Sequence, residues 1–165
     1  GVGAFGRGMQ ALADRGMDGR LRDHAGADRP LMGICLGAQL LLEHSSEFGD
    51  HAGLGVIDGV ALPFDSSIVR VPHIGWGRLS GNGAWDSPLF DQIPEESWMY
   101  FVHSFHMSPV HESDVLSVTA LGPTTFASAI RRNLTFGVQF HPEKSGPLGL
   151  RVLSNFLNLK ESVEE

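Results

Sequence analysis

The chain has 165 residues, of which 42% are hydrophobic and 19% charged, as expected for one globular domain. Its formal net charge is −7, and its 12 Lys and Arg residues are scattered rather than gathered in a basic stripe. These features argue against a nucleic-acid-binding protein, which needs positive charge to neutralise phosphates. No apolar run is long enough to predict a membrane-spanning segment, so no association with a membrane is expected. A single cysteine cannot form an internal disulfide, which favours a reducing, cytoplasmic location.

The first third of the chain predicts an α/β unit. The opening GVGAFG is a glycine-rich turn, after which Phe5, Met9 and Leu12 recur with helical spacing. PLMGIC is a compact apolar strand, and AQLLLEH is the helix that leaves it. A glycine-rich turn at the start of an α/β segment normally follows a strand, and none precedes it here. We therefore expect elements upstream of the turn to be missing.

The middle of the chain, residues 54–126, predicts strands and hairpins with few helices. Short β-like runs such as SIVRVPHIGW and WMYFVHSF are broken there by Gly, Pro, Asn and Asp. TFASAIRRNLTFGVQF predicts a further hairpin with its turn at residues 132–133. A last helix is expected from about Gly149, with Leu150, Leu153, Phe156 and Leu157 on one apolar face.

Cys35, the only cysteine, lies in Gly33-Ile34-Cys35-Leu36-Gly37, between the predicted strand and helix. This G-x-C-x-G pattern is the thiol version of a nucleophile elbow, a sharp turn that lifts the sulfur out of the sheet. A helix N-terminus would favour the thiolate, and the Leu36 N–H is placed to hold an oxyanion. Most lone cysteines are small buried hydrophobes, so the pattern alone leaves both interpretations open.

A general base for such a thiol is offered by His141, which follows FGVQF and precedes Pro142 and Glu143. A cysteine nucleophile needs a base within hydrogen-bond reach, and the base needs an acid that fixes its tautomer. His-Pro-Glu supplies both from one rigid turn, although Glu143 alone would be interpreted as an exposed charge. The histidines lack the spacing of metal ligands, so neither a metal site nor another cofactor is expected.

Together, GICLGAQ and GVQFHPEKSG resemble the class I, or triad, glutamine amidotransferases. GVGAFG, VPHIGW and YFVHSF are similar to the glutaminase subunits of imidazole glycerol phosphate synthase in particular, and the resemblance extends from residue 1 to about 157. It implies an α/β fold with an open, mostly parallel sheet, flanking helices and extra antiparallel strands. In that family a strand, a helix and a second strand precede the GVGAF turn. We therefore expect residues 1–165 to form a single domain, truncated at its N-terminus.

The resemblance also implies an activity. L-Glutamine would be hydrolysed to glutamate and ammonia by a catalytic triad of Cys35, His141 and Glu143. The oxyanion would be held by backbone N–H groups of Leu36 and of the Gly1-Val2-Gly3 turn. Ammonia would pass to a separate cyclase subunit, a (β/α)₈ barrel, as a step of histidine biosynthesis.

Further roles are implied for residues outside the triad. The implied glutamine-binding set is Gln39, Glu47, His103 and Ser104. The implied subunit interface is Trp76, Tyr100 and Lys144. Each has an ordinary alternative, because a Gln on a helix flank, an aromatic in a core and an exposed Lys need no functional reason. Gly77 departs from the family pattern, in which Asn is more usual, without touching the triad.

Two other interpretations stay open at this level. The chain is similar enough to other triad enzymes to be the amidotransferase of anthranilate or GMP synthesis, although VPHIGW favours the imidazole glycerol phosphate enzyme. It would be an inactive binding module if the missing N-terminal strands prevented the site from forming.

Overall fold

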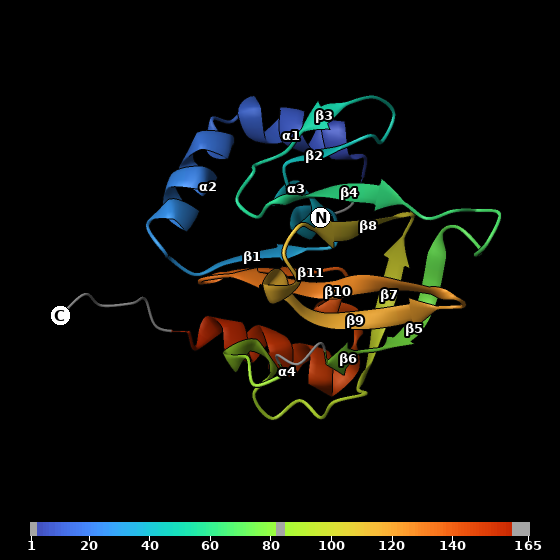
Figure 1. Ribbon diagram of the computed structural model, residues 1–165. Helices are drawn as coiled ribbons and strands as arrows, with labels where there is room; N and C mark the ends of the chain where they lie inside the picture. The colour runs from blue at the N-terminus through green and yellow to red at the C-terminus, as the bar shows by residue number, and fades with distance from the viewer. Residues whose placement is uncertain (1–2, 82–84, 160–165) are drawn as a thin grey trace.

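The computed structural model describes residues 3–81 and 85–159, and it has helices on both sides of a curled central sheet (Figure 1). The helices are α1 (Phe5–Ala13), α2 (Met17–Gly26), α3 (Leu36–Leu40) and α4 (Gly146–Leu157), and the 3-10 turns are η1 (Pro88–Phe90), η2 (Glu112–Asp114) and η3 (Pro142–Lys144). The strands are β1 (Leu31–Ile34), β2 (His44–Ser45), β3 (His51–Ala52), β4 (Gly59–Pro63), β5 (His73–Arg78), β6 (Ser80–Gly81), β7 (Trp98–His103), β8 (Phe105–Pro109), β9 (Val115–Leu121), β10 (Thr124–Arg132) and β11 (Thr135–Val138). None of the described helices is both long and apolar enough to cross a bilayer.

The main sheet is mixed. Its strand order is β1-β11-β10-β8-β4-β2-β3, with β9 paired to β10 and β6 paired to β9. Among the described strands, β1–β11 and β2–β4 pair in parallel and the other neighbours of this sheet are antiparallel. The predicted α/β fold is present, but the sheet differs from the mostly parallel one that we expected. The reason is local, because two-residue turns such as 122–123 can join only antiparallel strands.

Two apolar cores fill the two faces of this sheet. Helices α1 and α3 cover one face and α4 covers the other (Figure 1). A register shift in β10 turns Ala129 toward the α4 side and Ile130 toward the α3 side. The largest fully buried side chains of the α4 core include Phe101, Phe136 and Phe140, and those of the α1–α3 core include Phe5, Leu41 and Ile57. The Cys35 and His141 motifs therefore lie on a scaffold that is packed from both sides.

The helices differ from the sequence-based expectation in three places. Helix α2 was not predicted, because it buries no side chain and so has no apolar stripe. Helix α3 ends at Leu40 instead of continuing to His44, which lies in β2. In α4, Gly149 and Val152 are buried and Phe156 of the predicted face packs against the core, whereas the predicted Leu150 and Leu157 are exposed.

Candidate active site

Cys35 lies at a sharp turn where β1 ends and α3 begins. Its φ is +52°, a left-handed conformation that non-glycine residues adopt only under constraint. A Cβ on Gly33 would lie 2.5 Å from the Gly37 carbonyl oxygen and 2.6 Å from the Ala38 nitrogen, so only glycine lets the helix approach this closely. A Cβ on Gly37 would meet nothing within 4 Å. The predicted elbow is therefore present, and only its first glycine is required for close packing.

Two parallel strands bring the cysteine and histidine motifs together. Ile34 of β1 pairs with Val138 of β11, and the next N–H along, that of Cys35, donates to the Val138 carbonyl over 2.8 Å. Because neighbouring parallel strands end at the same edge of a sheet, the residues that follow them converge. His141 comes three residues after β11, and its N–H donates to the Tyr100 carbonyl of β7 over 2.8 Å.

His141 is oriented by Glu143. The Nδ1 atom of His141 lies 2.7 Å from a Glu143 carboxylate oxygen, which can only accept, so Nδ1 carries the proton and Nε2 has the free lone pair. Burial of Glu143 acts to raise the pKa of its carboxyl, but the hydrogen bond from His141, a backbone hydrogen bond and the nearby Lys144 charge act against it, and the pKa lies below its usual value. Among the described residues, Nε2 of His141 is the buried side-chain atom that lacks a hydrogen-bond partner. An unpartnered buried acceptor of this kind is ready to take a proton.

The Cys35 sulfur is buried and faces both donors and an acceptor. Burial raises the pKa of the Cys35 thiol, although the Leu36 N–H and the Gln139 amide act in the opposite direction. The Leu36 N–H at the start of α3 acts toward the thiolate, as expected, but burial outweighs it, so the resting site favours the thiol. Sγ lies 3.7 Å from the Val102 carbonyl oxygen. No hydrogen bond joins Sγ to His141 in the described part of the chain.

A pocket of about 230 Å³ opens beside the sulfur. It is lined by Gly3, Cys35, Leu36, Gln39, Glu47, Val102, His103, Ser104 and Phe105. The structure therefore brings all four predicted glutamine-binding residues to the predicted nucleophile. Gly3 and Leu36 of the predicted oxyanion set also line it, whereas Gly1 and Val2 lie outside the described residues.

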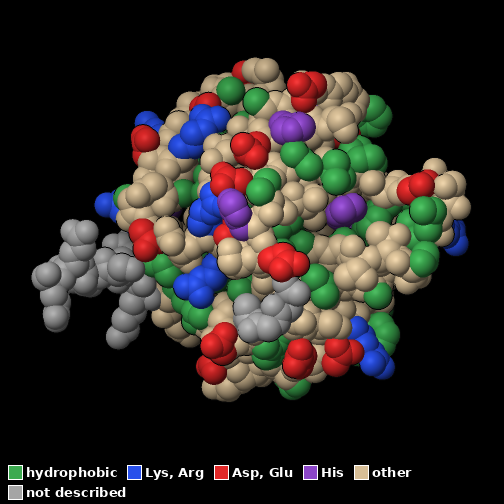
Figure 2. Space-filling model, viewed as in Figure 1, with side chains coloured by type: hydrophobic (Ala, Val, Ile, Leu, Met, Phe, Trp, Pro, Cys, Tyr) green, Lys and Arg blue, Asp and Glu red, His purple; other side chains and the backbone are tan. Residues whose placement is uncertain are grey.

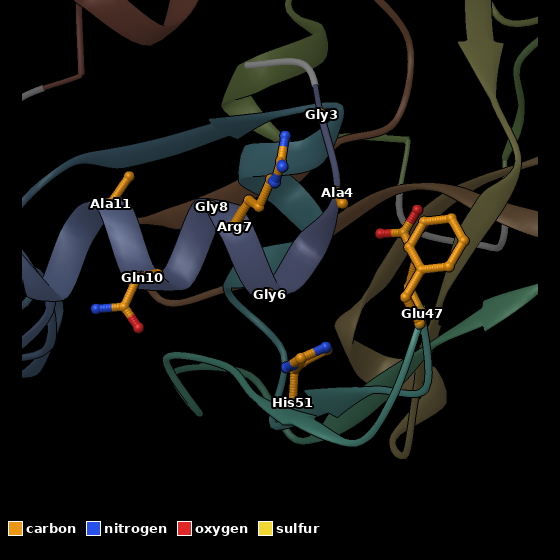
Figure 3. Close-up of a pocket in the computed structure, with 10 residues that line it drawn as sticks. Gly3, Ala4, Gly6, Arg7, Gly8, Gln10, Ala11, Glu47 and His51 are labelled. Carbon is orange, nitrogen blue, oxygen red and sulfur yellow. The ribbon is translucent and has the colours of Figure 1, made fainter.

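Glu47 connects this pocket with a larger hollow of about 860 Å³ beside α1 (Figure 3). One Glu47 oxygen accepts the Phe5 N–H at the start of α1 over 2.6 Å, where the helix dipole favours a negative charge. Gly3 and Glu47 line both cavities, and Arg7 and His51 line the larger one. The two cavities therefore adjoin at the start of α1.

A fully buried side chain that we did not identify from the sequence, Gln139, links these groups. Its Oε1 accepts from Gln39 Nε2 over 3.1 Å, and its Nε2 lies 3.6 Å from Cys35 Sγ. Gln39 also donates to the Phe105 carbonyl over 2.8 Å. The available signal was spacing, because Gln139 lies two residues before His141 near the end of the predicted strand TFGVQF, and residues two apart in a strand share a side.

His103 is held as a neutral ring. Its Nδ1 lies 2.8 Å from the Phe105 carbonyl oxygen, which can only accept, so Nδ1 is protonated. Nε2 must then accept from Nδ1 of the buried His73, 3.0 Å away. Burial lowers the pKa of His103 to about 3, so this wall of the pocket carries no charge at neutral pH.

The buried His103 predicts a measurable dependence of stability on pH. Unfolded His103 takes up a proton below about pH 6.5, but folded His103 does so only near 3, so the unfolded state binds more protons between these values. The free energy of unfolding is therefore unaffected by this group above about pH 6.5. Below that value it decreases as the pH is lowered, by about 1.4 kcal/mol per pH unit. Urea unfolding at several pH values gives the free energy of unfolding of the unmodified chain and of His103→Gln. The pH dependence of that free energy should be steeper for the unmodified chain by this slope. His73, His106 and His141, which face the ring, remain in both proteins, and equal slopes would contradict the assignment.

Two of the three predicted interface residues, Trp76 and Tyr100, lie on the outer face of the two-stranded sheet β5–β7. Alternation places Trp76 and Tyr100 opposite each other with ring centroids 5.8 Å apart, and Trp76 is 52% exposed. Ile74 and Trp98 on the same face are also exposed. Lys144 is exposed in η3, beside Glu143. The ordinary interpretation of Trp76 as a core residue is therefore wrong.

Hydrogen bonds from the Tyr100 backbone connect this outer face to the turn at residues 141–145. Its N–H donates to Ser145 Oγ over 2.9 Å, and that hydroxyl donates to the His141 carbonyl over 2.7 Å. Its carbonyl in turn accepts the His141 N–H. The histidine is thus fixed to the strand that carries the exposed aromatic side chains.

Surface charge is mixed on the face drawn in Figure 2, where Asp and Glu side chains lie between Lys and Arg side chains. One group of charged side chains forms ion pairs within the chain. The partly buried Arg132 pairs with Asp114 at 2.7 Å and with Asp58 at 3.1 Å. Among the described residues, no group of three or more His, Cys, Asp or Glu side chains is placed to hold a metal ion.

Comparison with known proteins agrees with the geometry. The family described as "Glutamine amidotransferase class-I" matches residues 8–159. The imidazole glycerol phosphate synthase subunit HisH of Chlorobaculum tepidum is 46% identical over 156 residues, which are 94% of this chain and 77% of that protein. The subunit of the same name from Sulfurimonas denitrificans is 44% identical over 160 residues, 94% of this chain and 75% of that protein.

Solved structures share the fold at lower identity. The structure of PurLQS from Thermotoga maritima matches with a TM-score of 0.66 and 20% identity, over 86% of this chain and 67% of that one. A crystal structure titled glutamine amidotransferase matches with a TM-score of 0.64 and 18% identity, over 89% of this chain and 71% of that one. From its motifs, its fold and these matches, the chain belongs to the class I glutamine amidotransferases, among the HisH subunits of imidazole glycerol phosphate synthase.

Proposed function

We propose that the chain hydrolyses L-glutamine to glutamate and ammonia and delivers the ammonia to a cyclase subunit of imidazole glycerol phosphate synthase. Cys35 is the nucleophile, His141 is the general base and then the general acid, and Glu143 orients His141. The observation that carries this proposal is the buried, unpartnered Nε2 of His141, backed by Glu143 and positioned by the strand that pairs with the nucleophile's strand. The relatives' names support the class of reaction.

The first half of the reaction breaks the amide. His141 Nε2 takes the thiol proton of Cys35, which burial keeps on the sulfur at rest, and Sγ attacks the side-chain carbonyl carbon of glutamine. The resulting oxyanion accepts from the Leu36 N–H and from the turn that includes Gly3. When the intermediate collapses, the C–N bond breaks, His141 gives its proton to the nitrogen, and ammonia leaves.

The second half releases glutamate. His141 removes a proton from water, the hydroxide attacks the thioester carbon, and the C–S bond breaks with return of the proton to Cys35. The chemistry needs no redox step and balances with one water consumed. The pair of half-reactions uses the same base and oxyanion donors twice, as a triad does.

Recognition of glutamine follows from the pocket walls. Glu47 keeps one oxygen on the Phe5 N–H and has its other oxygen for the substrate's ammonium group. Gln39 donates with its nitrogen to protein acceptors, which leaves its Oε1 as an acceptor for the substrate. His103 and Ser104 contribute an uncharged wall.

The cyclase subunit is proposed to dock on the outer face of β5–β7, with Trp76 and Tyr100 as its aromatic anchors and Lys144 near the ammonia passage. Exposed aromatic side chains on a monomer are typical of interfaces, where they bury large areas at low entropic cost. This face also lies against the catalytic turn through the Tyr100 backbone. Docking there would enclose the site from which ammonia leaves.

Trp76→Ala should weaken binding of the cyclase subunit by about 30-fold, since loss of a central aromatic anchor costs about 2 kcal/mol. Leu157→Ala is the control, because it also removes an exposed apolar side chain, but from the end of α4 instead of the β5–β7 face. Calorimetric titration of each variant with the cyclase subunit measures the effect. Equal affinities for the two variants would rule out this docking face.

Ammonia release tests the function itself. The chain mixed with the cyclase subunit and its acceptor substrate should release ammonia from L-glutamine, and the acceptor should gain the nitrogen. Glutamine labelled with ¹⁵N in the side-chain amide traces that transfer by mass spectrometry. An acceptor that gains nitrogen only from added ammonia, never from the labelled glutamine, would refute the proposal.

A further inference from the structure

The buried carboxamide of Gln139 has a defined orientation. Gln39 Nε2 lies 2.8 Å from the Phe105 carbonyl oxygen, which cannot donate, so the nitrogen end of the Gln39 amide is fixed. That nitrogen also lies 3.1 Å from Gln139, so the Gln139 atom facing it is the oxygen. The amide nitrogen of Gln139 is then the end that faces Cys35 Sγ, 3.6 Å away. One backbone carbonyl thus fixes both amides.

The position of Gln139 is as constrained as its orientation. The side chain is fully buried, and its backbone N–H donates to the Ser128 carbonyl of the neighbouring strand over 2.9 Å. It follows β11 directly and precedes His141 by two residues, so one short segment after β11 supplies both groups. Such a polar side chain is costly to bury unless its hydrogen bonds are made.

The surroundings of the sulfur indicate what this amide does. Of the polar groups that the structure places on Sγ, the Val102 carbonyl can only accept, so it favours the protonated thiol. The Leu36 N–H and the Gln139 amide can only donate to sulfur, and a donor favours the thiolate. Gln139 is the side-chain donor of the two, and the charge-assisted bond it would make to a thiolate is stronger than the bond to a neutral thiol.

We propose that Gln139 is a positioning residue of the glutaminase site. Its amide N–H stabilises the Cys35 thiolate when His141 removes the proton, and its carbonyl holds Gln39 with Oε1 turned to the substrate. Gln139 touches the reacting sulfur but neither accepts nor donates a proton in the reaction. The substrate half of this proposal rests on the proposed function, whereas the thiolate half does not require that glutamine be the substrate.

The pH dependence of alkylation tests the thiolate half directly, because Cys35 is the only thiol in the chain. Iodoacetamide reacts with the thiolate, so its rate against pH reports the apparent pKa of Cys35 in the folded protein. Gln139→Met keeps the length of the side chain and removes the donor. We expect its alkylation profile to move to higher pH by about one unit, that is about tenfold slower reaction at neutral pH.

Two further variants make the result specific. Gln139→Glu keeps an acceptor for Gln39 but places an oxygen against the sulfur, so its profile should shift at least as far as that of Gln139→Met. Ser128→Ala removes another buried hydrogen bond, that between Ser128 and Ser117, without touching the sulfur, and should keep the original profile. Circular dichroism verifies that each variant is folded.

Glutaminase kinetics with the cyclase subunit then separate the two halves of the proposal. Gln139→Met should lower kcat and raise KM, since Gln39 loses its partner, whereas Gln139→Glu should lower kcat with a smaller change in KM. An unshifted alkylation profile in a folded Gln139→Met or Gln139→Glu chain overturns the thiolate role. A shifted profile without any glutaminase activity in the unmodified chain would instead retain the thiolate role and refute the proposed function.

Discussion

Cys35→Ser is expected to lower ammonia release from glutamine by at least about 10⁴-fold, the usual cost of removing a nucleophile that works as part of a unit. A serine hydroxyl is far less acidic than a thiol, so His141 would have to take a proton from a much weaker acid. The substitution exchanges one atom at a buried position, so the fold and the φ of +52° should be retained.

The measurement is steady-state ammonia production by the variant in the presence of the cyclase subunit and acceptor substrate. Circular dichroism and the affinity for the cyclase subunit serve as controls for folding. A folded Cys35→Ser variant with activity near that of the unmodified chain would show that another residue attacks glutamine.

His141→Asn is expected to lower kcat by about 10²–10⁴-fold, the range that positioned general acid–base groups contribute. The Asn amide can still donate to Glu143 but has no basic lone pair to replace Nε2. Glu143→Gln should lose less than this, because Glu143 is 48% exposed and acts only through His141. Steady-state kinetics over a range of pH measure the three proteins. A Glu143→Gln variant more impaired than His141→Asn would contradict the assigned roles.

The geometry of the Cys35 and His141 motifs was predictable because each follows the end of a strand and has an unusual local sequence. Gly33 before Cys35 predicts the elbow through close packing, and the structure has that packing against the Gly37 carbonyl. The spacing of His141 and Glu143 predicts a hydrogen-bonded pair, and in the structure His141 Nδ1 lies 2.7 Å from Glu143 Oε1. Such signals are local, so one sequence is enough to find them.

Other features depend on contacts between distant segments, and the sequence alone could not supply them. Gln139 has its role only because Gln39, 100 residues earlier, turns its amide toward it. The raised pKa of Cys35 reflects how closely β7 covers the sulfur, which no neighbour in sequence indicates. Helix α3 was expected to be longer because Leu41 and Leu42 continue its apolar pattern, yet both are buried in the loop that follows it.

The exposed face of β5–β7 could be predicted from the sequence only in part. Trp76 and Tyr100 were expected at an interface from resemblance only, and in the structure their strands alternate so that both rings point outward. The residues between them on these strands face inward. One of them is Gly77, where an added Cβ would meet the Phe101 ring and Thr119. Strand register therefore fixes which side chains a partner subunit would meet, and register is not readable from one strand at a time.

Covalent labelling tests the central claim most directly. A glutamine analogue with an electrophilic diazoketone in place of the side-chain amide enters a glutaminase site as glutamine does and alkylates the residue that attacks. After treatment of the chain together with its cyclase subunit, intact mass and peptide mapping should give one adduct, on Cys35, and excess glutamine should slow its formation. An adduct on any other residue, or labelling of Cys35 that glutamine does not slow, would contradict the account.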